Sequence, residues 1–181
     1  MFTAHKLREE NIAEYLLYMW QVEDLIRANG FDIDRLNSTY LSKFGLDDEK
    51  QKELVEWYSN LIDMMRSEGV MEKGHLQINK NVAASLYELH LQLLKSPKHP
   101  FYSAAYYRAL PFIVELRGKG CAKDESEIEN CFDAMYGLMM LKLQGKPVSK
   151  ETAHAMECIA KLLGMLSEYY KKDKIGEVEH V

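Results

Sequence analysis

The spacing of apolar residues restricts most of this chain to helices. Apolar residues recur every three or four positions in about seven segments, and a glycine or proline ends nearly every segment. The predicted helices cover residues 6–29, 33–44, 48–68, 79–95, 100–117, 127–144 and 150–173. Apolar residues on both sides of a Glu-Lys-Gly turn are compatible with a small β-hairpin at residues 70–78. The sequence therefore predicts an all-α fold, an irregular antiparallel bundle of about seven helices with at most that one hairpin.

The length of the chain favours one domain, and its first residues, apolar runs and cysteines favour a place in the cytoplasm. A chain of 181 residues is long enough to bury its own core, so we expect a single helical domain at residues 1–173 and a flexible charged tail at 174–181. The first residues, MFTAHKLREEN, lack the apolar run of a signal peptide, and no run of about 18 apolar residues could cross a bilayer. Three widely spaced cysteines fit reduced thiols.

One acidic residue is predicted to point into the core. At 100° per residue with Ile12 as the reference, Glu23 falls in the middle of the apolar arc of the first helix. Arg27 follows four residues later, which is the spacing of an ion pair along a helix. We therefore expect Arg27 to be placed to pair with Glu23.

The fifth predicted helix carries a second inward ion by the same reasoning. Arg108 interrupts an apolar stripe, and Glu115 lies beside that face. The stripe consists of Phe101, Ala105, Phe112 and Leu116. Because an isolated buried charge costs several kcal/mol, we hypothesise that Glu23 and Arg108 meet across a helix interface. Pro111 lies inside this helix and predicts a kink or a restart.

Two interpretations of these ions stay open. The first is a buried ion pair that fixes how the helices pack. The second is a polar pocket in which Trp20, Glu23, Arg27 and Arg108, with Glu115 nearby, hold a small polar ligand or perform catalysis.

Several apolar residues lie off the main stripes of their helices and need a cover. They are Leu17, Leu25, Leu91, Met140 and Leu141. A helix that is apolar on a second side is either enclosed within the fold or part of an oligomer interface. We therefore treat these residues as a candidate interface and expect a homodimer, the commonest self-assembly.

The motifs that would indicate metal, nucleic acid or nucleophilic chemistry are weak. Glu151-x-x-His154 has the spacing of a carboxylate-bridged di-iron site, but a second such motif is missing, so we predict no metal and no cofactor. A winged-helix DNA reader would need a basic recognition helix, whereas residues 47–68 carry seven acids and three bases. With a net charge of -5, the chain has no nucleic-acid footprint. The sequence shows no phosphate-binding glycine loop and no nucleophile elbow.

Residues 10–28, ENIAEYLLYMWQVEDLIRA, followed by FDID at 31–34, resemble a family of all-helical proteins of Bacteroides-type bacteria that is described as a domain of unknown function. The resemblance implies an all-helical fold in a bacterial cytosol and assigns no reaction or ligand. The function that we predict is a non-enzymatic interaction or scaffold protein that self-associates. The alternatives are the ligand or enzymatic pocket around Glu23, Arg27 and Arg108, and the DNA binding that the acidic helix disfavours.

Overall fold

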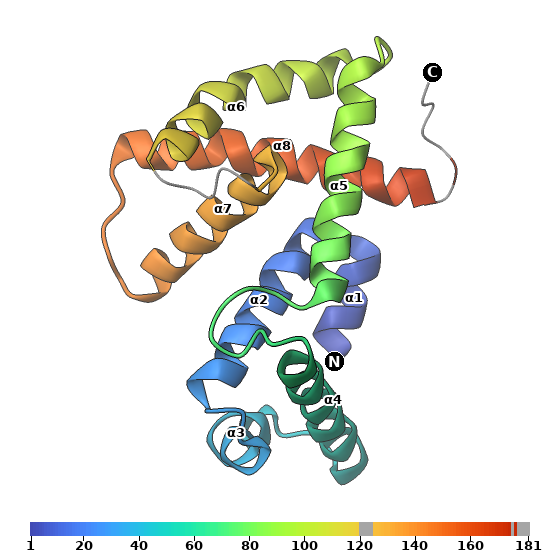
Figure 1. Ribbon diagram of the computed structural model, residues 1–181, viewed down its shortest axis with the longest axis vertical. Helices are drawn as coiled ribbons and strands as arrows, with labels where there is room; N and C mark the ends of the chain where they lie inside the picture. The colour runs from blue at the N-terminus through green and yellow to red at the C-terminus, as the bar shows by residue number, and fades with distance from the viewer. Residues whose placement is uncertain (120–124, 175, 177–181) are drawn as a thin grey trace. The chain divides into compact units, whose positions relative to one another are not determined.

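The computed structural model describes residues 1–119, 125–174 and 176, and these residues form eight α-helices and one short 3-10 helix (Figure 1). The helices are α1 (Phe2–Glu10), α2 (Ile12–Ala28), α3 (Ile33–Thr39), the 3-10 helix η1 (Leu41–Phe44), α4 (Asp48–Ser67), α5 (Gln77–Lys95), α6 (Pro100–Gly118), α7 (Glu127–Leu143) and α8 (Lys150–Lys174). No described residue lies in a strand, so the all-α prediction is confirmed. The hairpin predicted at residues 70–78 is wrong, because residues 70–76 form an irregular loop and α5 begins at Gln77.

The chain divides into two compact units by its internal contacts. The first unit contains Met1–Arg8 and Glu14–Asn81, and the second contains Glu9–Ala13 and the chain from Val82 onward. The single domain expected at residues 1–173 stays a prediction. The tail expected at residues 174–181 lies outside the described residues, apart from Lys174 at the end of α8 and Gly176.

The first predicted helix, at residues 6–29, is two helices in the structure. Asn11 separates α1 from α2, and its Oδ1 atom accepts hydrogen bonds from the backbone N–H of Ala13 at 3.2 Å and from Ser167 Oγ at 2.8 Å. An asparagine at this position satisfies an N–H that has no partner within the helix. The break therefore has a local cause, and Glu14 three residues later completes the sequence pattern of a helix start.

Two helices of the first unit begin with an aspartate cap. Asp32 accepts hydrogen bonds from two backbone N–H groups at the start of α3, and Asp47 accepts one from Lys50 N at 2.9 Å at the start of α4. The helix predicted at residues 33–44 is divided into α3 and η1, and Gly45 ends it with a φ of 61°. The fully buried side chains of this unit include Leu16, Ile26, Leu36, Leu41, Met65 and Leu76.

In the second unit α8 packs against both α6 and α7, and α6 also packs against α7 (Figure 1). α6 continues through Pro111 without a restart. The buried side chains at this packing centre include Tyr102, Ala109, Phe132, Ile159 and Leu162. Among the described residues, none of the helices is both long enough and apolar enough to cross a membrane.

Candidate functional site

Glu23 is buried as the sequence predicts, and its carboxylate has three hydrogen-bond partners. Its side chain on α2 is 0% exposed. Oε1 accepts hydrogen bonds from the backbone N–H of Leu76 at 3.0 Å and from Asn79 Nδ2 at 2.7 Å, and Oε2 lies 2.6 Å from His75 Nδ1. Hydrogen bonds to a carboxylate are among the stronger ones in proteins, and together they offset the cost of removing this group from water.

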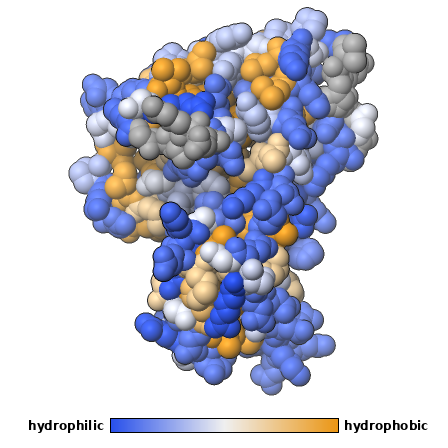
Figure 2. Space-filling view, in the orientation of Figure 1, coloured by the Kyte–Doolittle hydropathy of each residue, from blue (hydrophilic) through white to orange (hydrophobic). Residues whose placement is uncertain are grey.

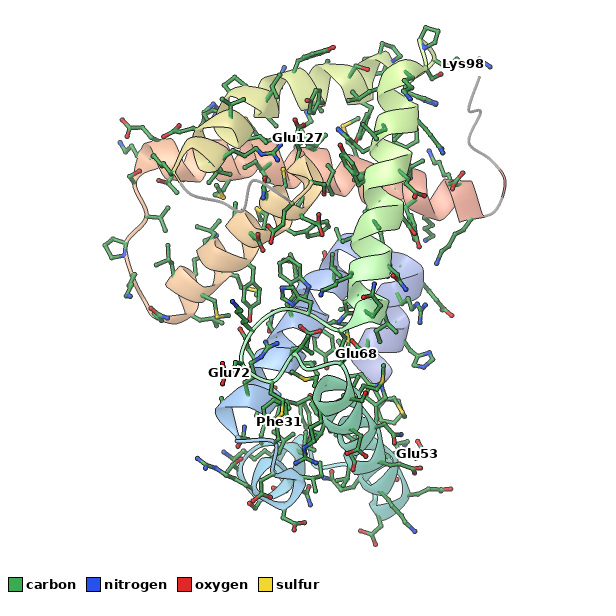
Figure 3. All side chains as sticks on the ribbon, viewed as in Figure 1. Phe31, Glu53, Glu68, Glu72, Lys98 and Glu127 are labelled. Carbon is green, nitrogen blue, oxygen red and sulfur yellow. The ribbon has the colours of Figure 1, made fainter. Side chains whose placement is uncertain are left out.

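The same carboxylate serves the start of α5. The first N–H groups of a helix lack partners within the helix, and a negative charge is favourable there. Glu23 accepts the N–H of Leu76, and Oε2 of Glu68, which Figure 3 labels at the end of α4, accepts the N–H of Gln77 at 2.6 Å. Two carboxylates from distant parts of the sequence therefore fix where α5 begins.

His75 is held between Glu23 and an aromatic ring. The indole of Trp20 stacks on the imidazole with ring centroids 4.1 Å apart and an interplanar angle of 11°. When Nδ1 donates its proton to Glu23, Nε2 is left as a hydrogen-bond acceptor. The side chain of His75 is 31% exposed, and Nε2 has no hydrogen-bond partner among the described residues. Trp20 thus lies at this centre, as predicted, but His75 and Asn79 were not predicted.

Arg27 binds the loop instead of Glu23, so the predicted pairing along the helix is wrong. Its guanidinium donates hydrogen bonds to the backbone carbonyls of Val70, at 3.0 Å, and Gly74, and forms an ion pair with Asp24 at 2.8 Å. Gly74 has a φ of 86°, a conformation that glycine adopts without strain, and this turn directs the loop carbonyls toward Arg27. Glu23 and Arg27 together therefore fasten residues 70–76 to α2.

The prediction that Arg108 points inward is wrong, and so is the predicted pair with Glu23. Arg108 and Glu115 are exposed on α6, whereas the hydrogen-bond donors of Glu23 come from its own unit. The residues of α6 that are buried are Tyr102, Ala105, Ala109 and Ile113, a different stripe from the one predicted. The predicted stripe failed because α6 is apolar on more than one side, and its small alanines allow close packing against neighbouring helices. Arg108 instead borders a cavity of about 190 Å³, which is also lined by His154, Glu157 and Lys161.

The outer side of α6 carries an exposed apolar stripe. Its members recur every three or four residues, and all are exposed: Pro100, Ala104, Tyr107, Pro111, Val114 and Gly118. The side chain of Tyr107 is 65% exposed and that of Val114 is 61% exposed, while Phe101 beside the stripe is 81% exposed. Figure 2 shows hydrophobic residues at the surface in the region of α6. We call these six residues and Phe101 the outer face of α6.

The residues predicted as an interface are less exposed than this face. Leu91 is 37% exposed and Leu141 is 36% exposed, while Leu17, Leu25 and Met140 are half-buried. None of the five is fully buried. Their role as an interface stays a prediction.

The described residues contain no group of three or more His, Cys, Asp or Glu side chains arranged to hold a metal ion. Glu151 and His154 are both exposed on α8. The ring of His154 instead meets the edge of Phe112, with centroids 5.7 Å apart.

These features define a class of all-helical protein in which a buried carboxylate organises one unit and an exposed apolar helix face marks the other. The chain belongs to the family described as Domain of unknown function (DUF4924), whose model matches residues 1–177. No curated protein matches the chain, and no solved structure does. The description of the family assigns no activity.

Proposed function

We propose that this protein is a non-enzymatic interaction or scaffold protein that self-associates through the outer face of α6. The observation that carries the proposal is the exposure of large apolar side chains along one line of that helix, including Tyr107 and Val114. Isolated exposed apolar residues are common, but a continuous stripe marks a surface that another protein covers. A bacterial and cytoplasmic setting, which the resemblance of residues 10–28 implies, belongs to the same proposal.

The polar centre at Glu23 supports a structural role for that residue. Both carboxylate oxygens accept hydrogen bonds from the loop and the start of α5, and Arg27 holds the loop by its carbonyls. A carboxylate whose oxygens are both used in this way is a poor general base, because its lone pairs are engaged in the fold. The Glu23 centre is therefore structural, and the surface that binds a partner is the one on α6.

Sedimentation equilibrium tests the proposal. We expect the wild-type protein to form dimers, and Val114→Glu to weaken the dimer roughly 100-fold, because the interface would bury two uncompensated carboxylates. Leu143→Glu is the matched control, since it adds the same charge at another exposed apolar position in the same unit, outside both the outer face of α6 and the residues predicted as an interface, and should leave the dimer intact. A wild-type protein that is monomeric at all accessible concentrations would refute self-association.

A second candidate function is the binding of a small ligand at His75. The observation that favours it is the partly exposed imidazole, which Glu23 and Trp20 hold in a fixed orientation with Nε2 unpartnered among the described residues. Such a nitrogen accepts a hydrogen bond from an N–H or O–H group of a ligand. This proposal retains Trp20 and Glu23 of the predicted pocket and replaces its arginines with a histidine.

An NMR screen tests this second function. Fragments that donate N–H or O–H groups should shift the side-chain signals of Trp20 and His75 together, and the shifts should disappear in His75→Phe, which keeps an aromatic ring against Trp20. If no fragment shifts these signals at millimolar concentration, the second function is excluded.

A further inference from the structure

Two of the three charged residues of α6, Arg108 and Glu115, lie together on one flank of its outer face. With Arg108 as the reference at 100° per residue, Glu115 is about 20° away, and the six residues of the apolar stripe fall within an arc of about 80° next to them. Both side chains are exposed, and Arg108 has no ion-pair partner among the described residues. Among the described residues Glu115 has a single ion pair, with Lys119 at the end of the same helix, and both side chains are more than half exposed.

Arg108 and Glu115 lie at equal distances on either side of the Pro111–Phe112 midpoint of α6. Arg108 lies three residues before Pro111, and Glu115 lies three residues after Phe112. Two antiparallel copies of α6 can be related by a twofold axis that passes through the Pro111–Phe112 midpoint and is perpendicular to the plane of the two helices. This axis places Arg108 of one copy level with Glu115 of the other. The same axis keeps both charged flanks on one side of the helix pair. A single contact of this kind therefore forms two reciprocal ion pairs.

The apolar stripe fits the same axis by size. Tyr107 lies four residues before Pro111, so it faces position 116 of the second copy, between Val114 and Gly118. The ring of Tyr107 then lies beside the open space at Gly118 of the second copy. In the single chain, a Cβ added to Gly118 has nothing within 4 Å. Ala104 comes level with position 119, one residue past Gly118, and Pro111 comes level with position 112, one residue from the Pro111 of the second copy. Small residues at these heights allow the helix axes to approach to about 8 Å.

We propose that the partner of α6 is a second copy of this chain, bound as an antiparallel helix pair in which Arg108 of each copy forms an ion pair with Glu115 of the other. This inference rests on the self-association proposed above and adds its geometry. It assigns Arg108 a role at the rim of the contact. The charges set the register of the helices, while the apolar stripe supplies most of the affinity.

Charge reversal tests the arrangement. Arg108→Glu and Glu115→Arg should each weaken the dimer roughly tenfold, because each change creates two like-charge contacts per dimer. The double variant Arg108→Glu with Glu115→Arg should recover the wild-type dissociation constant within about threefold, because both pairs are restored with opposite polarity. Sedimentation equilibrium measures the constants. Circular dichroism should show unchanged thermal unfolding of the monomer, since both side chains are exposed.

Two negative outcomes have different meanings. If the protein dimerises and Val114→Glu disrupts the dimer, but the double variant is weaker than either single variant, the antiparallel arrangement is wrong and the proposed function stands. If the wild-type protein never dimerises, both proposals fail. Lys142→Glu, a reversal of an exposed charge on α7, is the control that should leave the constant unchanged.

Discussion

At the scale of single residues, Glu23 matters through the donors that converge on it. Removing its carboxylate leaves the N–H of Leu76 and the amide of Asn79, which is 1% exposed, without their acceptor. An unsatisfied buried donor costs about 1–3 kcal/mol, and here two such donors and a small cavity coincide.

We therefore expect Glu23→Ala to lower the free energy of unfolding by about 3 kcal/mol, as measured by urea denaturation. Asp63→Asn is the control, because it removes an acid that is 73% exposed and 3.6 Å from its partner Arg66, and such surface pairs contribute about 1 kcal/mol or less. Equal and small effects of the two substitutions would show that the Glu23 centre does not hold the loop.

His90 gives the protein a pH dependence with a definite sign. It is 1% exposed, its Nδ1 lies 2.7 Å from the hydroxyl of Tyr102, and burial lowers its pKa from 6.5 to about 4. Below pH 6.5 the unfolded chain binds a proton at this residue that the folded chain does not bind until about pH 4. Stability is therefore lost as the pH falls through this window, by up to about 3 kcal/mol.

His90→Gln should remove this contribution while keeping a side chain that can form a hydrogen bond with Tyr102. Urea denaturation at several pH values between 6.5 and 4 measures the slope. All other titrating groups are common to both proteins, so the variant should show a slope smaller by about one proton. Parallel slopes would mean that His90 is protonated in the folded protein.

The inward direction of Glu23 could be predicted from the sequence, but its partners could not. The angle of Glu23 on its helix depends only on residues within a few turns. His75 and Asn79 lie more than 50 residues away along the chain, His75 in the predicted hairpin and Asn79 at the start of the next predicted helix. Only the turn at Gly74 and the ends of α4 and α5 bring them to α2. No local pattern in the sequence indicates that these segments meet.

At the scale of elements, the reliable predictions are those with a cap or a stop in the sequence. Ser126 and Glu129 form a capping box at the start of α7, and Asp47 caps α4, and both cap residues stand at the predicted helix starts in the sequence. The break at Asn11 had a comparable signal in Asn11 and Glu14, but the long apolar pattern on both sides of it concealed the start of a new helix.

α6 shows why periodicity alone can fail. Apolar residues occupy both its inner and its outer side, so the spacing is compatible with two opposite orientations. The alanines at 105 and 109 decide the outcome, because they let α6 pack closely, and they contribute little to a hydrophobic pattern. The exposed outer face is therefore a finding of the structure, since the predicted core stripe contained only one of its residues, Phe101.

At the scale of the whole molecule, buried polar contacts hold the fold, and the exposed outer face of α6 is the surface that we propose a second copy covers. Membership in the Domain of unknown function (DUF4924) family extends over residues 1–177, so both the Glu23 centre and α6 lie within the family's region. The central claim is that two copies pair antiparallel through α6, with the twofold axis near Pro111.

Disulfide cross-linking measures that claim most directly. Single cysteines are introduced in a Cys121→Ser background, in which Cys131 and Cys158 remain buried. On oxidation, the cysteine of Pro111→Cys should form a disulfide with the same cysteine of the second copy, because the two positions face each other across the axis. Ala104→Cys should not, since its two copies lie about 22 Å apart along the helices, far beyond disulfide reach. A mixture of Ala104→Cys and Gly118→Cys proteins should cross-link between the two kinds of chain. Efficient self-cross-linking of Ala104→Cys, or none of Pro111→Cys, would contradict the account.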